Sequence, residues 1–268
     1  MRILAIETAT TWQSVAILDD NRVLAQRDQD ASGAHGTLLL PAIDRLLMDT
    51  QLRITDLDGL ACSAGPGSFT GIRVGLATGL GLRAATGLPL VLVPTLEAMA
   101  WGVNSSGLPI CPIVTSRRGE LYWAVFRRTG EDQLHRLMTD CVGPPAALAR
   151  SLTEHTFVLG DGWSAMKSEI RAALPGAVTV SVGPLEAKPS AAAVAVLGAQ
   201  RFRRGEIVGD RVEPLYVQRA EAELQYDQSG GVSPVLRRQE RVTEKIAERL
   251  AKRRQGRQLA AQPRKKHV

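Results

Sequence analysis

Aromatic residues, paired cysteines and long apolar runs are all scarce in this chain of 268 residues. Phe, Trp and Tyr make up 4% of the residues, which disfavours a stacking platform for single-stranded nucleic acid or sugar. Cys62, Cys111 and Cys141 are odd in number and widely separated within apolar segments. This pattern fits neither a disulfide framework nor a metal site, so we expect buried free thiols in a reducing compartment.

No run of about 18 uncharged apolar residues is present, so no membrane-spanning helix is expected. Only Arg2 precedes the short apolar stretch that Glu7 stops, and a secretory signal peptide is therefore not predicted. Hydrophobic residues at 44% and charged residues at 22% are typical of a globular protein with a buried core. We expect a soluble cytoplasmic protein without a membrane partner.

The net charge of +6 comes from the end of the chain. Residues 237–268 hold twelve Lys or Arg against three Glu, whereas the rest holds 21 basic and 24 acidic residues. Two interpretations stay open for this tail: a solvated helix with a frayed end, or a segment that attracts RNA phosphates. The candidate RNA-binding residues are Arg237, Arg238, Lys252, Arg253, Arg254, Lys265 and Lys266.

Strand and helix patterns occur twice in the same order, βββαβαβα. The first set is strands 2–6, 14–18 and 22–27, helix 34–50, strand 58–64, helix 70–86, strand 90–93 and helix 95–103. The second is strands 110–114, 122–127 and 134–139, helix 144–151, strand 156–159, helix 164–174, strand 178–182 and helix 190–204. We predict an α/β fold with halves 1–106 and 107–225, followed by a linker and basic helical or disordered tail, 226–268.

This plan resembles the RNase H-like, actin-like superfamily of ATPases and sugar kinases (ASKHA). In that superfamily the opening hairpin turn of each half grips phosphate and carries a carboxylate for metal or water. Here the first turn offers Glu7, which is longer by one methylene, and the second turn, at Thr115, has no acid. Neither turn has paired glycines that would let backbone amides close around a phosphate. We therefore expect the actin-like fold without the phosphate and metal chemistry of that superfamily.

The segment Ser63-Ala-Gly-Pro-Gly-Ser-Phe-Thr-Gly-Ile-Arg resembles the signature of the TsaB (YeaZ) family, a subunit of the bacterial machinery that makes threonylcarbamoyladenosine in tRNA. Ile3-Leu-Ala-Ile-Glu-Thr-Ala-Thr, Arg118-Gly-Glu-Leu-Tyr and Glu213-Pro-Leu-Tyr-Val-Gln-Arg are similar to that family too. The resemblance covers residues 1–220. It implies a heterodimer with TsaD, the catalytic paralogue, to which the TsaE ATPase is recruited, while TsaC supplies the threonylcarbamoyl adenylate. It also implies contact with tRNA through the complex.

The glycines of this segment favour a tight turn from strand to helix, with a hydroxyl capping the helix. A phosphate loop is the alternative, but no Lys follows and the spacing fits neither Walker nor dinucleotide motifs. Weak candidates for a nucleotide site are Glu7, Thr8, Gly65, Gly67, Ser68 and Thr70. No cofactor of the chain's own is expected, and an ATP or ADP retained at a subunit interface stays open.

Two helices in the first half are more apolar than one sheet contact requires. Gly71, Gly75 and Gly79 share one stripe that lets another backbone approach, although each costs about 1 kcal/mol against Ala. In one interpretation the helices pack only on each other and on the sheet. In the other they also form a patch that contacts the paralogue, or a second copy of the chain when the paralogue is absent. The candidate residues are Leu39, Ile43, Leu46, Leu47, Gly71, Ile72, Gly75, Leu76 and Gly79.

No catalytic or metal-binding set emerges from the sequence. The four histidines are not spaced as a metal pair, and His35 is expected to be a capping or surface group. Asp161 is either a turn residue or a binding carboxylate. The favoured hypothesis is a non-catalytic scaffold of the tRNA-modifying complex. The alternative is a free-standing enzyme, either an ATP-dependent phosphotransferase or a metallopeptidase-like hydrolase, in which Glu7 would act without a partner acid.

Overall fold

In a computed structural model of the protein, the described residues are 1–117, 119–130, 132–183, 187–209, 215 and 217. Residues Met1–Val217 form one compact unit. The predicted linker and tail, 226–268, lie outside the described residues together with all seven RNA-binding candidates. Arg118 and Glu213, which open two of the family-like segments, also lie outside them.

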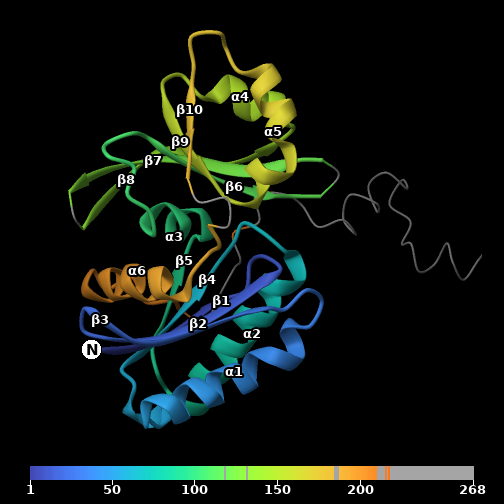
Figure 1. Cartoon of the computed structure of the whole chain (residues 1–268). Helices are drawn as coiled ribbons and strands as arrows, with labels where there is room; N and C mark the ends of the chain where they lie inside the picture. The colour runs from blue at the N-terminus through green and yellow to red at the C-terminus, as the bar shows by residue number, and fades with distance from the viewer. Residues whose placement is uncertain (118, 131, 184–186, 210–214, 216, 218–268) are drawn as a thin grey trace, which may run out of the picture. The chain divides into compact units, whose positions relative to one another are not determined.

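The first half contains a five-stranded mixed sheet of order β3-β2-β1-β4-β5 (Figure 1). β1 pairs antiparallel with β2 and parallel with β4, because β1 and β2 form a hairpin and β4 returns after a helix. The elements are β1 (Arg2–Glu7), β2 (Trp12–Asp19), β3 (Arg22–Asp30), α1 (His35–Thr50), a 3-10 turn (Ile54–Asp56), β4 (Gly59–Ser63), α2 (Phe69–Thr86), β5 (Leu90–Val93) and α3 (Thr95–Trp101).

The second half repeats this order in a sheet of order β10-β9-β6-β7-β8. Its elements are β6 (Ile110–Thr115), β7 (Leu121–Gly130), β8 (Gln133–Gly143), α4 (Pro145–Ser151), β9 (Thr156–Leu159), α5 (Asp161–Ala173), β10 (Val180–Val182) and α6 (Ala191–Arg203). The duplicated βββαβαβα order confirms the predicted fold class.

The last helix of each half covers the sheet of the other half. α6 packs on β1, β2, β4 and β5, and α3 packs on β6 and β7. Figure 1 shows α3 and α6 between the two sheets. Along β1 the buried side chains alternate accordingly: Ile3 belongs to the cluster around α6, whereas Leu4 and Ile6 belong to the cluster beneath α1 and α2. Each sheet is thus covered on both faces.

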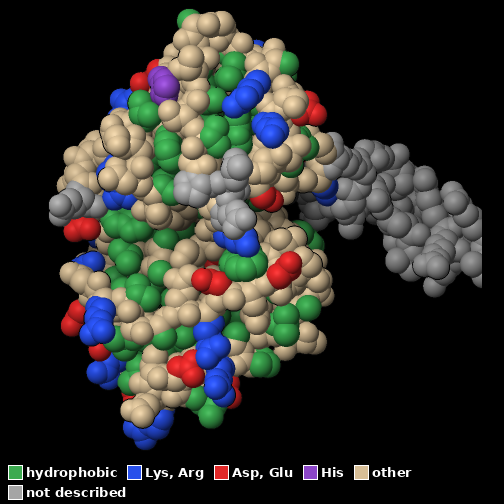
Figure 2. Space-filling view, viewed as in Figure 1, with side chains coloured by type: hydrophobic (Ala, Val, Ile, Leu, Met, Phe, Trp, Pro, Cys, Tyr) green, Lys and Arg blue, Asp and Glu red, His purple; other side chains and the backbone are tan. Residues whose placement is uncertain are grey.

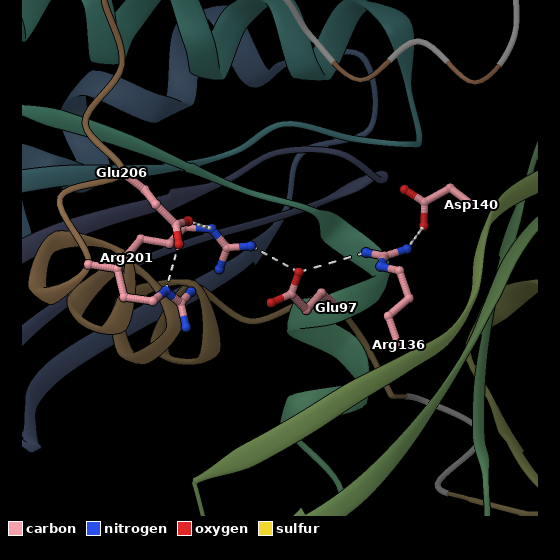
Figure 3. Close-up of polar contacts among 6 residues, drawn as sticks. Glu97, Arg136, Asp140, Arg201 and Glu206 are labelled. Carbon is pink, nitrogen blue, oxygen red and sulfur yellow. Dashed lines mark hydrogen bonds and ion pairs between the residues drawn. The ribbon is translucent and has the colours of Figure 1, made fainter.

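An ion-pair network connects these crossing helices to β8 (Figure 3). The Glu97 carboxylate on α3 lies 2.9 Å from Arg201 of α6 and 3.7 Å from Arg136 of β8. Arg136 also pairs with Asp140 at 2.5 Å, and Arg201 with Glu206 at 3.7 Å. Glu97 of the first half contacts two arginines of the second half, so it is the centre of the network. Within the described ranges, no helix combines the length and the apolar character that crossing a membrane requires.

Candidate functional site at the glycine-rich loop and helices α1 and α2

The glycine-rich loop between β4 and α2 packs against the turn between β1 and β2. The Ser68 amide donates to the Ala9 carbonyl at 2.6 Å, and the Gly65 carbonyl accepts from the Thr95 amide at 2.8 Å. Gly65 and Gly67 have φ of +99° and +154°, and a Cβ at Gly67 would collide with the Ala9 carbonyl. Three of the six weak nucleotide-site candidates, Gly65, Gly67 and Ser68, therefore form a turn that bonds to its own chain.

Ser68 caps α2, which confirms the predicted hydroxyl cap. Its hydroxyl accepts a hydrogen bond from the Gly71 amide at 3.2 Å. The buried Thr8 hydroxyl then donates to the Gly71 carbonyl at 2.9 Å, which joins the β1–β2 turn to the first turn of the helix.

The glycine stripe on α2 faces the same chain. A Cβ at Gly71 would collide with the Thr8 carbonyl, one at Gly75 with the Thr8 hydroxyl, and one at Gly79 would lie 2.5 Å from the Cys62 sulfur. The predicted close approach of a neighbouring backbone is confirmed at Gly71. The neighbour is the chain's own β1–β2 turn rather than another polypeptide.

Glu7 ends β1 and is fully buried. Its Oε1 accepts from the Ala9 amide at 2.6 Å, and its Oε2 has no hydrogen-bond partner within the described part of the chain. Burial raises the pKa of Glu7 to about 7, because removing the carboxylate from water disfavours its charged form. Hydrogen bonds from the Ala9 amide and the Ser63 hydroxyl oppose this rise without cancelling it.

The second half has a matching contact at the same strand ends. Thr115 of β6 bonds to Asp161, which follows β9, as Thr8 after β1 bonds to Ser63 of β4. The Thr115 hydroxyl donates to Asp161 Oδ2 at 2.6 Å, and the Thr115 amide donates to Oδ1 at 3.1 Å. Of the two interpretations for Asp161, this geometry favours the structural one, because both carboxylate oxygens bond to the chain.

His35 is buried, which corrects its expected position at the surface. As the first residue of α1, its Nε2 lies 2.9 Å from the Thr10 carbonyl and so connects the helix to the β1–β2 turn. Among the residues that the structure describes, no group of three or more His, Cys, Asp or Glu is arranged to hold a metal ion.

The prediction that these nine residues contact a partner needs correction. Eight of the nine are buried within the chain, and Leu47 alone is half-buried. The leucines and isoleucines pack on β-strand residues such as Leu4, Ile6 and Leu60 because the sheet face itself needs an apolar cover. These buried residues, Leu39, Ile43, Leu46, Gly71, Ile72, Gly75, Leu76 and Gly79, do not offer a contact surface in this structure.

The same helices expose other apolar residues, which were not predicted from the sequence. Leu40 is 56% exposed, Met48 63% and Phe69 37%. Ala77 and Ala84 are exposed on α2, and we call these five residues the α1/α2 outer face. Figure 2 shows hydrophobic side chains among charged ones in the region where Figure 1 draws α1 and α2. Spacing could have found this face: residues 77 and 84 lie two helical turns apart, opposite the buried glycine stripe.

Comparisons with known proteins agree with the geometry. Residues 28–226 match the family model for TsaD, tRNA N6-adenosine threonylcarbamoyltransferase. The TsaB protein of Escherichia coli, named for tRNA threonylcarbamoyladenosine biosynthesis, is 31% identical over 227 residues, which cover 81% of this chain and 94% of the relative. The protein of the same name from Haemophilus influenzae is 29% identical, over 62% of this chain and 74% of the relative. The solved structure of YeaZ from Pseudomonas aeruginosa superposes with a TM-score of 0.67 at 25% identity, over 80% of this chain and 99% of that one.

Proposed function

The chain belongs to the TsaB (YeaZ) family of tRNA threonylcarbamoyladenosine biosynthesis proteins, and from this membership we propose that it is a non-catalytic subunit that docks on a TsaD-type transferase. The single observation that carries the docking proposal is the α1/α2 outer face. It leaves large apolar side chains in water on two helices that already pack their other faces on the sheet. Such a patch on a soluble protein is typical of a surface that another protein covers.

The choice of partner follows from the family match. The chain matches the TsaD model over residues 28–226, so a TsaD-type protein has the same fold and presents corresponding helices. Two related chains can therefore pair through equivalent helical faces, as homodimers do. We propose that a TsaE-type ATPase and tRNA join this pair. The alternative partner for the same face is a second copy of this chain.

The non-catalytic part of the proposal rests on the two carboxylates at the strand ends. Glu7 is buried and bonds to the Ala9 amide, and both oxygens of Asp161 accept hydrogen bonds from Thr115. A carboxylate that handles a metal ion or activates water has to present an oxygen that the metal or water can reach, whereas Glu7 is fully buried and both oxygens of Asp161 are bonded. Turnover of ATP or of a peptide substrate by the purified chain alone would contradict this part.

Docking is tested by placing a charge on the outer face. We expect Leu40→Glu and Met48→Glu each to weaken binding to the purified TsaD-type paralogue by about tenfold or more, since central apolar contacts contribute about 1–2 kcal/mol each. The matched control is Leu137→Glu, because Leu137 is 51% exposed on β8, away from both helices. Affinity is measured by calorimetry, and thermal melts check that all variants fold. Unchanged affinity in both outer-face variants would reject this docking surface.

Charges at buried positions of the same helices, such as Leu76→Glu or Ile43→Glu, would not test docking. Both side chains are buried in the first half, so a charge there would destabilise the fold before it affected a partner. The exposed positions separate the two effects.

We also propose that the basic tail contributes to tRNA binding. Its twelve Lys or Arg can each contact a phosphate. Each contact makes the slope of log affinity against log salt concentration more negative by about 0.9 for duplex nucleic acid. We expect a chain without residues 237–268, in the assembled complex, to bind tRNA more weakly and with a flatter salt dependence. Equal affinity at low salt would reject this role for the tail.

A further inference from the structure

A hollow of about 480 Å³ lies between α3 and α6, on elements that the docking proposal does not use. Met99, Trp101 and Val103 line it from α3 and the residues after it, and Ala192, Ala193 and Val196 line it from α6. Small-molecule sites typically occupy about 300–1,000 Å³ and have mainly apolar walls. This hollow has the size and the lining of such a site.

The hollow has room because small side chains stand where the two helices meet. Ala192 and Ala193 face it from the first turn of α6. Larger residues at these positions would fill the space between the helices.

Trp101 gives the hollow a fixed aromatic wall. The Arg128 guanidinium lies 4.8 Å from the centre of the Trp101 ring, and the same group donates to the Trp101 carbonyl at 2.6 Å. The contact with the ring restricts the indole, and the hydrogen bond holds the Trp101 backbone beside Arg128. A rigid indole favours a flat aromatic ligand, since aromatic rings gain about 0.5–1.5 kcal/mol from paired packing beyond their area.

Lys188 provides the charge of the hollow. Lys188 is the single charged residue among the described lining residues, and its ammonium lies 3.2 Å from the centre of the Trp12 ring. The other polar member, Ser190, already accepts from the Ala192 amide at 3.2 Å and lies 3.3 Å from the Gln26 amide oxygen. A ligand group that approaches Lys188 is therefore expected to be anionic.

A second hollow of about 240 Å³ also has Trp101 in its lining, together with Glu97, Asp132 and Arg204. The Asp132 carboxylate disfavours an anionic ligand there, because like charges repel. The anionic group is expected at the Lys188 end and the ring against Trp101.

We propose that the hollow between α3 and α6 binds a small organic anion, in which a flat aromatic ring system carries one negatively charged group. This site is independent of the α1/α2 outer face, and neither proposal depends on the other.

The test uses two fluorescent probes on the full chain: 8-anilinonaphthalene-1-sulfonate, which is anionic, and N-phenyl-1-naphthylamine, which has the same rings and no charge. We expect both to bind saturably at one site per chain. Ala192→Phe, which fills the hollow, should weaken both probes by about tenfold. Lys188→Gln should weaken the sulfonate about two- to fivefold, as for an exposed ion pair, and leave the neutral probe unchanged.

Matched controls lie on α5, where Ala172 and Lys167 are exposed. Ala172→Phe and Lys167→Gln should leave both affinities unchanged. Equal sulfonate affinity in Lys188→Gln and in Lys167→Gln would overturn the proposal. Because Lys188 is exposed, its substitution should not disturb the fold, and this comparison holds even if Ala192→Phe does not fold. Light scattering that shows a dimer dissociated by Ala192→Phe would also overturn it, because a second copy would then fill the hollow.

Discussion

Replacing Glu7 by Gln should remove a pH dependence of stability that the buried carboxylate creates. Glu7 is fully buried at the end of β1, and its pKa rises from an ordinary 4.5 to about 7 through loss of solvation. Between these values the folded chain keeps a proton that the unfolded chain has released. The free energy of unfolding therefore falls as the pH rises from 4.5 to 7, and stays low above pH 7.

The size of this fall follows from the two pKa values. Each pKa unit corresponds to 1.36 kcal/mol, so the shift from 4.5 to about 7 corresponds to about 3 kcal/mol. Glutamine cannot ionise, and its carbonyl oxygen can still accept from the Ala9 amide. Its NH₂ group takes the place of Oε2, which has no partner among the described residues, and this costs about 1–3 kcal/mol at every pH. This cost is the same at every pH, so it lowers the stability of the variant without adding a pH dependence.

The assay is urea unfolding of the wild type, of Glu7→Gln and of the exposed control Glu169→Gln at pH values from 4.5 to 8.5. The difference in unfolding free energy between wild type and Glu7→Gln should change by about 3 kcal/mol between pH 4.5 and 8, in favour of the variant at high pH. Glu169→Gln should follow the wild type throughout. If the difference in unfolding free energy between wild type and Glu7→Gln is constant across this range, Glu7 does not keep a proton in the folded chain.

Three further predictions concern packing, thiol reactivity and the ion-pair network. Gly75→Ala should lower the free energy of unfolding by about 1–3 kcal/mol because its Cβ meets the Thr8 hydroxyl, whereas Gly81→Ala, which meets no atom within 4 Å, should raise it by up to about 1 kcal/mol in the same urea titration. Ellman's reagent should leave Cys62 unmodified in the native chain and modify it after unfolding, since burial raises the pKa of its thiol to about 12. Glu97→Ala should lower the melting temperature by several degrees, corresponding to about 2 kcal/mol, because it leaves two arginines without their shared carboxylate; an unchanged melt would show that the network contributes nothing to stability.

The order of the regular elements and the limits of some of them could be predicted because they depend on local signals, whereas β7 and β8 are longer than predicted. Strand β5 and strand β9 occur at the predicted residues, and α2 begins one residue before its predicted start, where Ser68 caps it. Hydrophobic periodicity, glycine and capping residues all act within a few positions in the chain. The duplicated order followed from these signals alone.

Which residues remain exposed depended on contacts distant in sequence. The apolar character of α1 and α2 was visible, but the extent to which the first sheet would bury Leu39 or Leu76 was not. The glycine stripe predicted a close approach without identifying the Thr8 turn, which lies more than sixty residues away. The matching bonds from Thr8 to Ser63 and from Thr115 to Asp161 likewise depend on strand pairing that only the fold provides.

The position of α6 has a consequence for synthesis on the ribosome. One face of the first sheet, including Ile3 and Ala5, is covered by residues 191–203, which are translated long after the strands themselves. Until residues 191–203 leave the exit tunnel, the sheet face that they cover stays exposed in the nascent chain. The amino-terminal portion therefore cannot complete its folding in order of translation, and ribosome-associated chaperones have a defined interval in which to shield it.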